Sequence, residues 1–207
     1  MMQIKRAAYR VLAEAHIQSV LTFDDVMRIC RANNWRVCSY AHARDLILEF
    51  DLDEKARKHK GFVLRGADRT LILYRESLST RERITVIAHE IGHIVLGHQP
   101  GDTFSHVEDA QEIEAHVFAY ELVCPSIVLQ RCGPWRCEEL REVCPVTIDG
   151  ISYYIAEMRK RILAYDPLFD QIIDQYSDMI ERLRKIKRRD RTRFLGAITA
   201  LFGATRW

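Results

Sequence analysis

The sequence predicts an α+β fold that is mostly helical, with one small β-hairpin or sheet. Apolar residues recur at helical spacing through most of the 207 residues, and two short apolar runs separated by turn residues lie between the helical stretches. A composition of 48% hydrophobic and 29% charged residues is that of a globular protein. Because no apolar run approaches the roughly 18 residues that cross a bilayer, and no secretory leader is evident, we expect a cytoplasmic protein.

The N-terminal stretch, up to about Phe50, is expected to form three helices. Thr22 precedes two acidic residues, as a capping side chain at the start of a helix does. Ser39 is the expected cap of the next helix, whose apolar side chains Ala43 and Ile47 fall on one face. This part of the chain is therefore interpreted as an N-terminal helical layer.

The two short apolar runs, 62–64 and 70–74, are separated by Arg65-Gly66-Ala67-Asp68-Arg69. Gly and Asp between two such runs are typical of a turn that joins antiparallel strands. We therefore predict a β-hairpin over 61–75.

The most regular helical pattern follows the hairpin, over residues 80–98. Ser79 and Glu82 stand at the spacing of a capping box, in which each side chain bonds to the backbone of the other residue. Gly97 and Pro100 mark its end, because glycine favours the left-handed turn that closes a helix and proline cannot continue one.

This helix carries the motif His89-Glu90-Ile91-Gly92-His93. Two histidines four residues apart stack on one helix face, so both rings can bind one metal ion without distorting the backbone. Glu90 is placed to take a proton from a metal-bound water, whose pKa a zinc ion would lower. We predict a zinc-peptidase site with His89 and His93 as ligands and Glu90 as the catalytic base. Mn²⁺ or Fe²⁺ also suits such ligands.

A third protein ligand must come from outside this motif. The extended metzincin pattern requires Gly at position 96 and His at position 99, where the chain has Leu96 and Gln99. The remaining arrangement takes a glutamate from a following helix, as in the gluzincins.

Glu112 and Glu114 both fall in the next predicted helix. Only one of them can face the metal, because residues two apart on a helix project about 200° apart. We prefer Glu112, since His116 lies one turn further and would then support the site. Glu114, and His106 or His116 as a ligand, remain alternatives.

Two motifs in order make a recognisable pattern: residues 88–98 have the sequence AHEIGHIVLGH, and residues 112–119 have EIEAHVFA, followed by ELVCP. This pattern resembles the ImmA/IrrE family of metallopeptidases. The resemblance implies a gluzincin-like peptidase with a small sheet beside the metal helix, covering the chain to about Leu163. It also implies cleavage of a helix-turn-helix repressor that controls a mobile element or a stress response. His116 stands where the family tends to have Asn or Asp, so the third ligand stays open.

A role in substrate binding is predicted for the second strand of the hairpin, which consists of Leu71, Ile72, Leu73 and Tyr74. In zinc peptidases of this design an edge strand pairs with the substrate backbone and fixes the scissile bond over the metal. A purely structural hairpin is the alternative.

The metal helices are predicted at 80–98 and 108–123, the second ending before Pro125, and a further helical segment at 138–163. Together with the N-terminal helices and the hairpin they are interpreted as one peptidase domain, residues 1–165. The remainder, 166–207, is predicted to be a basic helix and an apolar tail.

The basic run 182–193 contains eight Lys or Arg residues and one Asp. It is a candidate contact for nucleic acid, and a solvated helix face is the alternative. A membrane surface is the less favoured partner for the apolar residues that follow. For the whole chain, the alternative to a peptidase is a non-proteolytic regulator that binds a repressor or an antitoxin partner.

Overall fold

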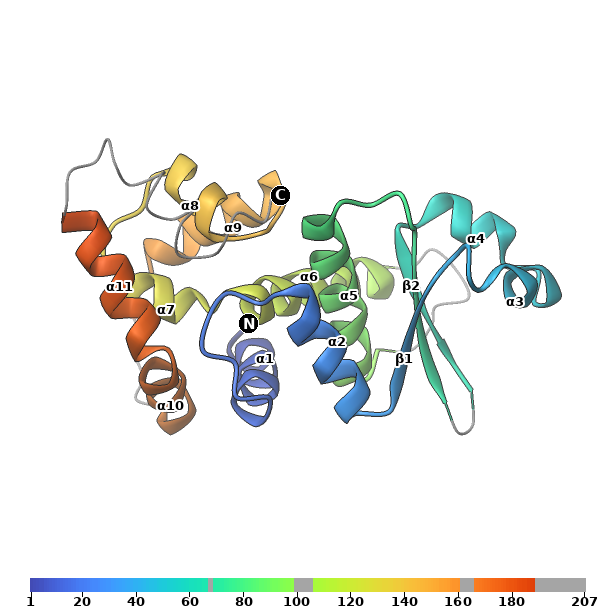
Figure 1. Cartoon of the computed structure of the whole chain (residues 1–207), viewed down its shortest axis with the longest axis horizontal. Helices are drawn as coiled ribbons and strands as arrows, with labels where there is room; N and C mark the ends of the chain where they lie inside the picture. Colours follow the sequence, from blue (N-terminus) through green and yellow to red (C-terminus); the bar gives the residue numbers. More distant parts are fainter. Residues whose placement is uncertain (67–68, 99–105, 161–165, 189–207) are drawn as a thin grey trace.

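The computed structural model describes all residues except 67–68, 99–105, 161–165 and 189–207. The described part is mostly helical with one three-stranded sheet, which confirms the predicted α+β class (Figure 1). Its elements are α1 (Met2–Glu14), α2 (Phe23–Ala32), β1 (Trp35–Ser39), α3 (Arg44–Glu49), α4 (Asp53–Lys58), β2 (Gly61–Arg65), β3 (Thr70–Tyr74), α5 (Thr80–Val95), α6 (His106–Val123), α7 (Ser126–Arg131), α8 (Cys137–Val143), α9 (Ile148–Met158), α10 (Pro167–Gln175) and α11 (Ser177–Arg188).

The two predicted N-terminal caps at Thr22 and Ser79 are confirmed. Each hydroxyl accepts a hydrogen bond from the backbone N–H three residues on, and the acidic side chain at that position bonds back to the backbone of the cap. The expected cap at Ser39 is wrong. Ser39 ends β1, a short strand that we did not predict, and α3 begins only after Ala43.

The sheet has the order β1-β3-β2, with β1 parallel and β2 antiparallel to β3. The predicted hairpin is confirmed, and Gly66 donates its N–H to the carbonyl of Arg69 across the turn. β3, which contains Leu71–Tyr74, is the central strand and is paired along its whole length on both sides. The expectation that β3 is a substrate-binding edge strand is therefore wrong, because its backbone groups are already bonded to β1 and β2.

The sheet packs its two faces differently. Val37, Val63 and Ile72 contribute to the main core on the face toward α2 and α5. Phe62 and Leu73 lie on the opposite face, in a small separate cluster with residues of the α3 region. Because side chains alternate along a strand, neighbouring positions fall into different clusters.

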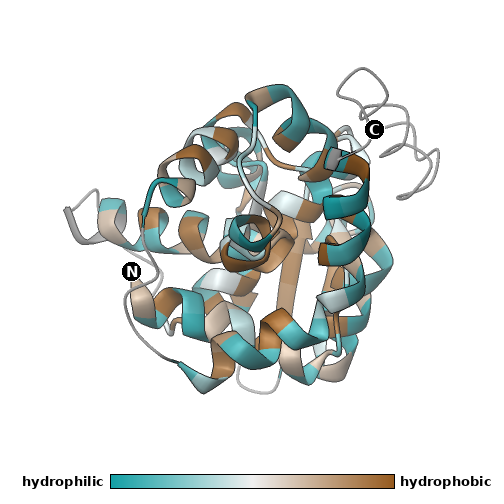
Figure 2. Cartoon of the chain, turned by 90° about the vertical axis from the view of Figure 1, so that its left-hand side faces the viewer, coloured by the Kyte–Doolittle hydropathy of each residue, from teal (hydrophilic) through white to brown (hydrophobic). Residues whose placement is uncertain are grey.

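The main core continues from α1 to α11 without a break. Phe169, Ile172 and Leu183 of α10 and α11 are buried in the same cluster as Ile4 and Leu12 of α1. Figure 2 shows apolar ribbon concentrated toward the middle of this end of the molecule. The described helices after residue 166, α10 and α11, therefore contribute to the same core as α1.

Part of the predicted basic run is used in packing. Lys187 lies 3.6 Å above the Trp135 ring, and Arg184 donates to the carbonyl of Arg131. The residues from 189 onward, with the apolar tail, lie outside the described part of the chain. Nucleic-acid contact by this run stays a prediction. Among the described helices, none has the length and apolar character that a membrane span requires.

Candidate metal centre

The two helices that carry the motifs approach each other closely. A Cβ atom placed on Gly92 would lie 3.1 Å from Phe118 Cδ1 and 3.2 Å from Ala115 Cα. Because Gly92 has no side chain and that of Ala115 is small, the backbone of α5 at Gly92 lies close to the backbone of Ala115 and to the ring of Phe118 on α6. Because positions three and four apart share a helix face, His89 and His93 on α5 are brought against Glu112 on α6.

Three ligand atoms come together at this crossing. His89 Nε2 lies 3.0 Å from His93 Nε2, and the Glu112 carboxylate lies 3.1 Å from His89 Nε2 and 3.3 Å from His93 Nε2. Ligand atoms about 2.0–2.1 Å from a tetrahedral zinc ion lie about 3.3–3.4 Å from one another. The spacing, and a donor set of two imidazoles and one carboxylate, both suit a divalent metal such as zinc.

His116 offers a second combination. One ligand atom each from His89, Glu112 and His116 lie within 4.8 Å of one another, and the rings of His89 and His116 are 4.4 Å apart between centroids. In the set that contains His93, the corresponding distances are 3.0–3.3 Å, close to the edge of a tetrahedral metal site. The shorter distances favour the set with His93 and leave His116 beside it.

The two candidate glutamates of α6 are separated as the helical geometry predicts. Hydrogen bonds from His89 and His93 hold the pKa of the Glu112 carboxyl well below its ordinary value. The Glu114 carboxylate instead lies 3.1 Å from Nε2 of His98. Of the two, only Glu112 reaches the histidine pair. The side chain of His106, the remaining alternative, lies outside the described part of the chain.

A residue that the motif analysis passed over, His98, also contacts the centre. Its Nδ1 lies 3.0 Å from Nδ1 of His93, and its side chain is buried. Gly97 has φ of 72°, and this left-handed turn lets the N–H of His98 bond back to the carbonyl of His93. The only sequence signal was a histidine one position away from the rejected metzincin pattern.

With a metal ion on Nε2 of His93, these contacts would have the following proton assignment. His93 Nδ1–H donates to His98 Nδ1, and His98 Nε2–H donates to the Glu114 carboxylate. Nε2 of His93 would then carry no proton and could bind the metal, whereas in the structure it lies 3.3 Å from the Glu112 carboxylate. A ligating histidine commonly donates its second N–H in this way, because the bond fixes both its tautomer and its orientation.

Comparison with known families gives one match. Residues 46–134, somewhat less than half of the chain, match Peptidase_M78, the IrrE N-terminal-like domain. The chain carries a metallopeptidase domain of the ImmA/IrrE family. No curated protein and no solved structure gave a significant match. The ImmA/IrrE match covers β2, β3, α5, α6 and α7, so it includes His89, Glu90, His93 and Glu112, whereas β1 and α8–α11 lie outside it.

Glu90 of the ImmA/IrrE domain lies against the first residue of β2. Its side chain is 6% exposed, and burial raises the pKa of its carboxyl. A Cβ on Gly61 would lie 2.4 Å from Val86 Cγ1 and 3.5 Å from Glu90 Oε1. Glycine at this position therefore allows the backbone of β2 to approach the metal helix at the catalytic-base position.

β2 is an edge strand that runs beside the metal helix. Its Arg65, at the other end from Gly61, donates to the carbonyl of His93 at 2.7 Å. The N–H of Arg75 donates to the carbonyl of Lys60, and the N–H of Gly66 donates to the carbonyl of Arg69. Because alternate residues of an antiparallel strand bond to the neighbouring strand, these two bonds show which residues of β2 face β3. The backbone groups of Gly61, Val63 and Arg65 consequently point away from β3. The strand with a free edge next to α5 is thus β2, where we had predicted β3.

Proposed function

We propose that the chain is a zinc-dependent endopeptidase that cleaves a helix-turn-helix repressor and thereby derepresses genes of a mobile element or a stress response. The observation that supports the chemistry is the meeting of His89, His93 and Glu112 at 3.0–3.3 Å, with Glu90 adjacent. The class of substrate rests on the ImmA/IrrE family, which the match over 46–134 supports.

His89, His93 and Glu112 would hold the metal through two imidazole nitrogens and one carboxylate. Zinc is the default ion for this donor set, and Mn²⁺ or Fe²⁺ suits it as well. When bound, the ion lowers the pKa of a coordinated water and polarises the scissile carbonyl. Nδ1 of His89 is buried and has no hydrogen-bond partner among the described residues, so His93, through His98, is the better anchored of the two rings.

Glu90 would act as the general base. Its carboxylate accepts the proton of the attacking water and returns it to the leaving nitrogen of the cleaved peptide. Burial against β2 restricts that carboxylate to the region between α5 and the sheet. His116 is exposed and lies beside His89, with 4.4 Å between the ring centroids.

The backbone of the substrate would pair with the edge of β2. The outward groups of Gly61, Val63 and Arg65 offer the hydrogen bonds of one more strand, and an extended segment bound there would run along α5 past Glu90. This assignment replaces the one for Leu71–Tyr74, whose backbone groups are bonded within the sheet.

The decisive experiment co-expresses the protein with the repressor encoded beside it. Wild-type protein should cleave the repressor, whereas Glu90→Gln should bind it and leave it intact. Glu76→Gln, at an exposed glutamate before α5, is the matched control and should cleave like wild type. If wild type and Glu90→Gln bind the repressor and leave it equally intact, the chain is a non-proteolytic regulator and the proposal is wrong.

A further inference from the structure

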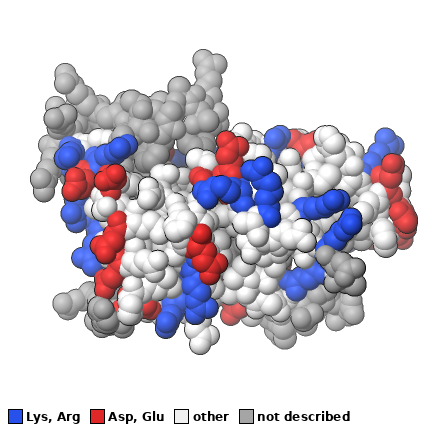
Figure 3. Space-filling view, turned by 60° about the horizontal axis from the view of Figure 1, so that its bottom comes forward, with Lys and Arg blue, Asp and Glu red and all other residues white. Residues whose placement is uncertain are grey.

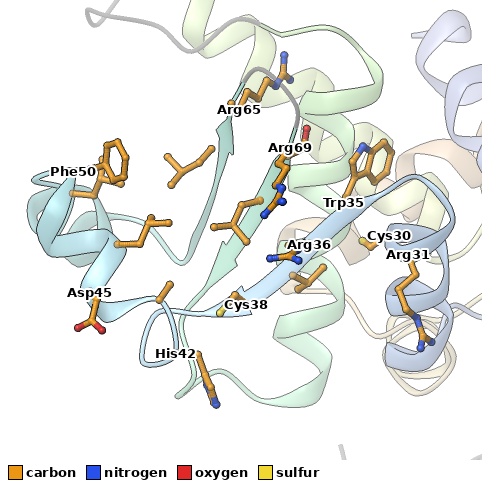
Figure 4. Close-up of a pocket in the computed structure, with 18 of the residues that line it drawn as sticks. Cys30, Arg31, Trp35, Arg36, Cys38, His42, Asp45, Phe50, Arg65 and Arg69 are labelled. Atoms are coloured by element: carbon orange, nitrogen blue, oxygen red, sulfur yellow. The ribbon is translucent and has the colours of Figure 1, made fainter.

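A groove of about 980 Å³ lies at the free edge of β1, and the metal ligands are not among its lining residues. β1 pairs only with β3 among the described strands, so its other edge carries unpaired backbone groups. Figure 4 shows Arg36 on β1 and Arg69 just before β3, with Phe50 on one side and Cys30 and Trp35 on the other. Of the residues that the proposed peptidase chemistry uses, only Arg65 is among the described lining residues of this groove.

The groove extends over both faces of the sheet at this edge. Successive residues of β1 point to opposite faces, and residues 35 to 38 all line the groove. Trp35 and Val37 point toward α2, where Met27 and Cys30 form an apolar wall. An added strand would therefore place every second side chain against this wall.

The opposite side of the edge is apolar at its floor and basic at its rim. Leu64 and Leu71 line it from the sheet, together with Phe50, whose side chain is 62% exposed. Arg36 is paired in register with Leu71, and Arg69 immediately precedes Thr70, the first residue of β3. Arg36 therefore projects on the face that carries the two leucines, and both arginines line the groove.

The charge of the groove is strongly one-sided. Arg31, Arg36, Arg65 and Arg69 line it, and Asp45 is the only acidic residue among its described lining residues. Neither Arg36 nor Arg69 forms an ion pair with an acid in the described part of the chain. In Figure 3, Lys and Arg side chains lie in the middle of the right-hand half, and the Asp and Glu side chains of that half lie toward its edges.

We propose that the edge of β1 binds an extended acidic segment of a protein partner, which adds to the sheet as a fourth strand. Its apolar side chains would alternate with carboxylates that pair with Arg36 and Arg69, and backbone bonds to β1 would supply sequence-independent affinity. The chain's own residues 189–207 have the wrong charge for this groove, with four Arg and one Asp. The free edges of β1 and β2 are the two opposite edges of the sheet, with β3 between them. One partner could therefore pair with β1 through one segment and with β2 through another.

The test uses two fluorescein-labelled octapeptides, one alternating glutamate with valine and one alternating lysine with valine. Binding to the full-length Glu90→Gln protein, which should not cleave them, is measured by fluorescence anisotropy. The acidic peptide should bind at least about tenfold more tightly, and added salt should weaken it. Amide hydrogen exchange should slow in residues 35–39 and stay unchanged in 61–65.

Charge reversal locates the site. The double variant Arg36→Glu with Arg69→Glu should weaken binding of the acidic peptide by at least about tenfold. Arg10→Glu, at an exposed position on α1, should leave it unchanged. Thermal unfolding checks that each variant is folded, and Arg36→Gln with Arg69→Gln replaces the double variant if charge reversal prevents folding.

Three outcomes would overturn the proposal. Equal binding of the acidic and basic peptides would remove the charge argument. Slowed exchange in 61–65 in place of 35–39 would assign the peptide to β2. A dimer in analytical ultracentrifugation that the double variant dissociates would identify a second copy of the chain as the occupant. None of these results depends on whether the metal centre cleaves peptides.

Discussion

Helix α6 carries two clusters of ionisable side chains that differ in how their charges are balanced. Near its start, Glu112 meets His89 and His93, and its side chain is 54% exposed. Near its end, Glu121 is fully buried and faces Lys5 of α1 at 3.0 Å. The two glutamates lie on the same helix, but their surroundings differ: Glu112 faces two histidines, and Glu121 faces a lysine.

The buried cluster has all its partners within the chain. The Glu121 carboxylate accepts from the hydroxyls of Tyr9 and Tyr153 and from the backbone N–H of Ser126, and Lys5 supplies the counter-charge. At the metal end, two imidazoles and a carboxylate converge, and within the described residues no Lys or Arg is ion-paired with Glu112. The partners of Glu121 are those of a structural cluster, whereas the donor set around Glu112 is the one that we propose holds a metal ion.

The largest effect is expected from breaking the buried cluster. Glu121→Leu leaves Lys5 with the charge of Glu157 alone and removes the acceptor for both tyrosines. We expect the free energy of unfolding to fall by about 3–5 kcal/mol, because two tyrosine hydroxyls and the N–H of Ser126 lose their acceptor at about 1–3 kcal/mol each while Lys5 keeps Glu157. Urea denaturation followed by circular dichroism measures it, and Glu112→Leu is the control on the same helix. A loss below about 1 kcal/mol would show that the cluster is not needed for stability.

The matching change at the metal end should alter metal affinity and leave the fold intact. Glu112→Gln removes one of three proposed ligands, so zinc affinity should fall by more than the roughly 10–100-fold that loss of a supporting residue costs. Glu114→Gln should have the smaller effect, because its carboxylate contacts His98 and not the histidine pair. Competition with a chromophoric chelator measures both. A larger loss of zinc affinity in Glu114→Gln than in Glu112→Gln would identify Glu114 as the ligand.

His98 should show an intermediate effect. His98→Ala removes the acceptor for His93 Nδ1, and we expect zinc affinity to fall by roughly 10–100-fold. His98→Asn should recover part of that loss, because its side-chain oxygen can accept the same hydrogen bond. The visible absorption of the Co²⁺-substituted protein should shift in His98→Ala and return toward wild type in His98→Asn. Equal spectra and affinities in all three proteins would reduce His98 to a packing residue.

The comparison also separates what local sequence could predict from what it could not. The capping box of Ser79 and Glu82 and the four-residue spacing of His89 and His93 depend on one helix, so they were predicted correctly. Helical geometry likewise separated Glu112 from Glu114, since only one face of α6 can meet α5.

Features that depend on long-range pairing were missed. β1 is only five residues long, and its pairing with Thr70–Tyr74 made β3 a central strand, which no local pattern in either segment indicates. Lys5 is 116 residues away from Glu121 by sequence number, so the buried network could not be inferred from spacing. His98 was passed over because its contact with His93 depends on the left-handed turn at Gly97.

The smallest effect is expected where the two helices of the metal end touch. In Gly92→Ala the new methyl group would lie 3.2 Å from the Ala115 backbone, and α6 would have to shift. Overpacking costs about 1–3 kcal/mol, and the better helix propensity of alanine returns about 1 kcal/mol. We expect a net loss of about 1 kcal/mol, together with weaker zinc binding because Glu112 moves away from His89 and His93. Urea denaturation and chelator competition on the same samples measure the two quantities. A variant that is more stable than wild type and binds zinc equally well would mean that the spacing of the ligands does not depend on the close approach at Gly92.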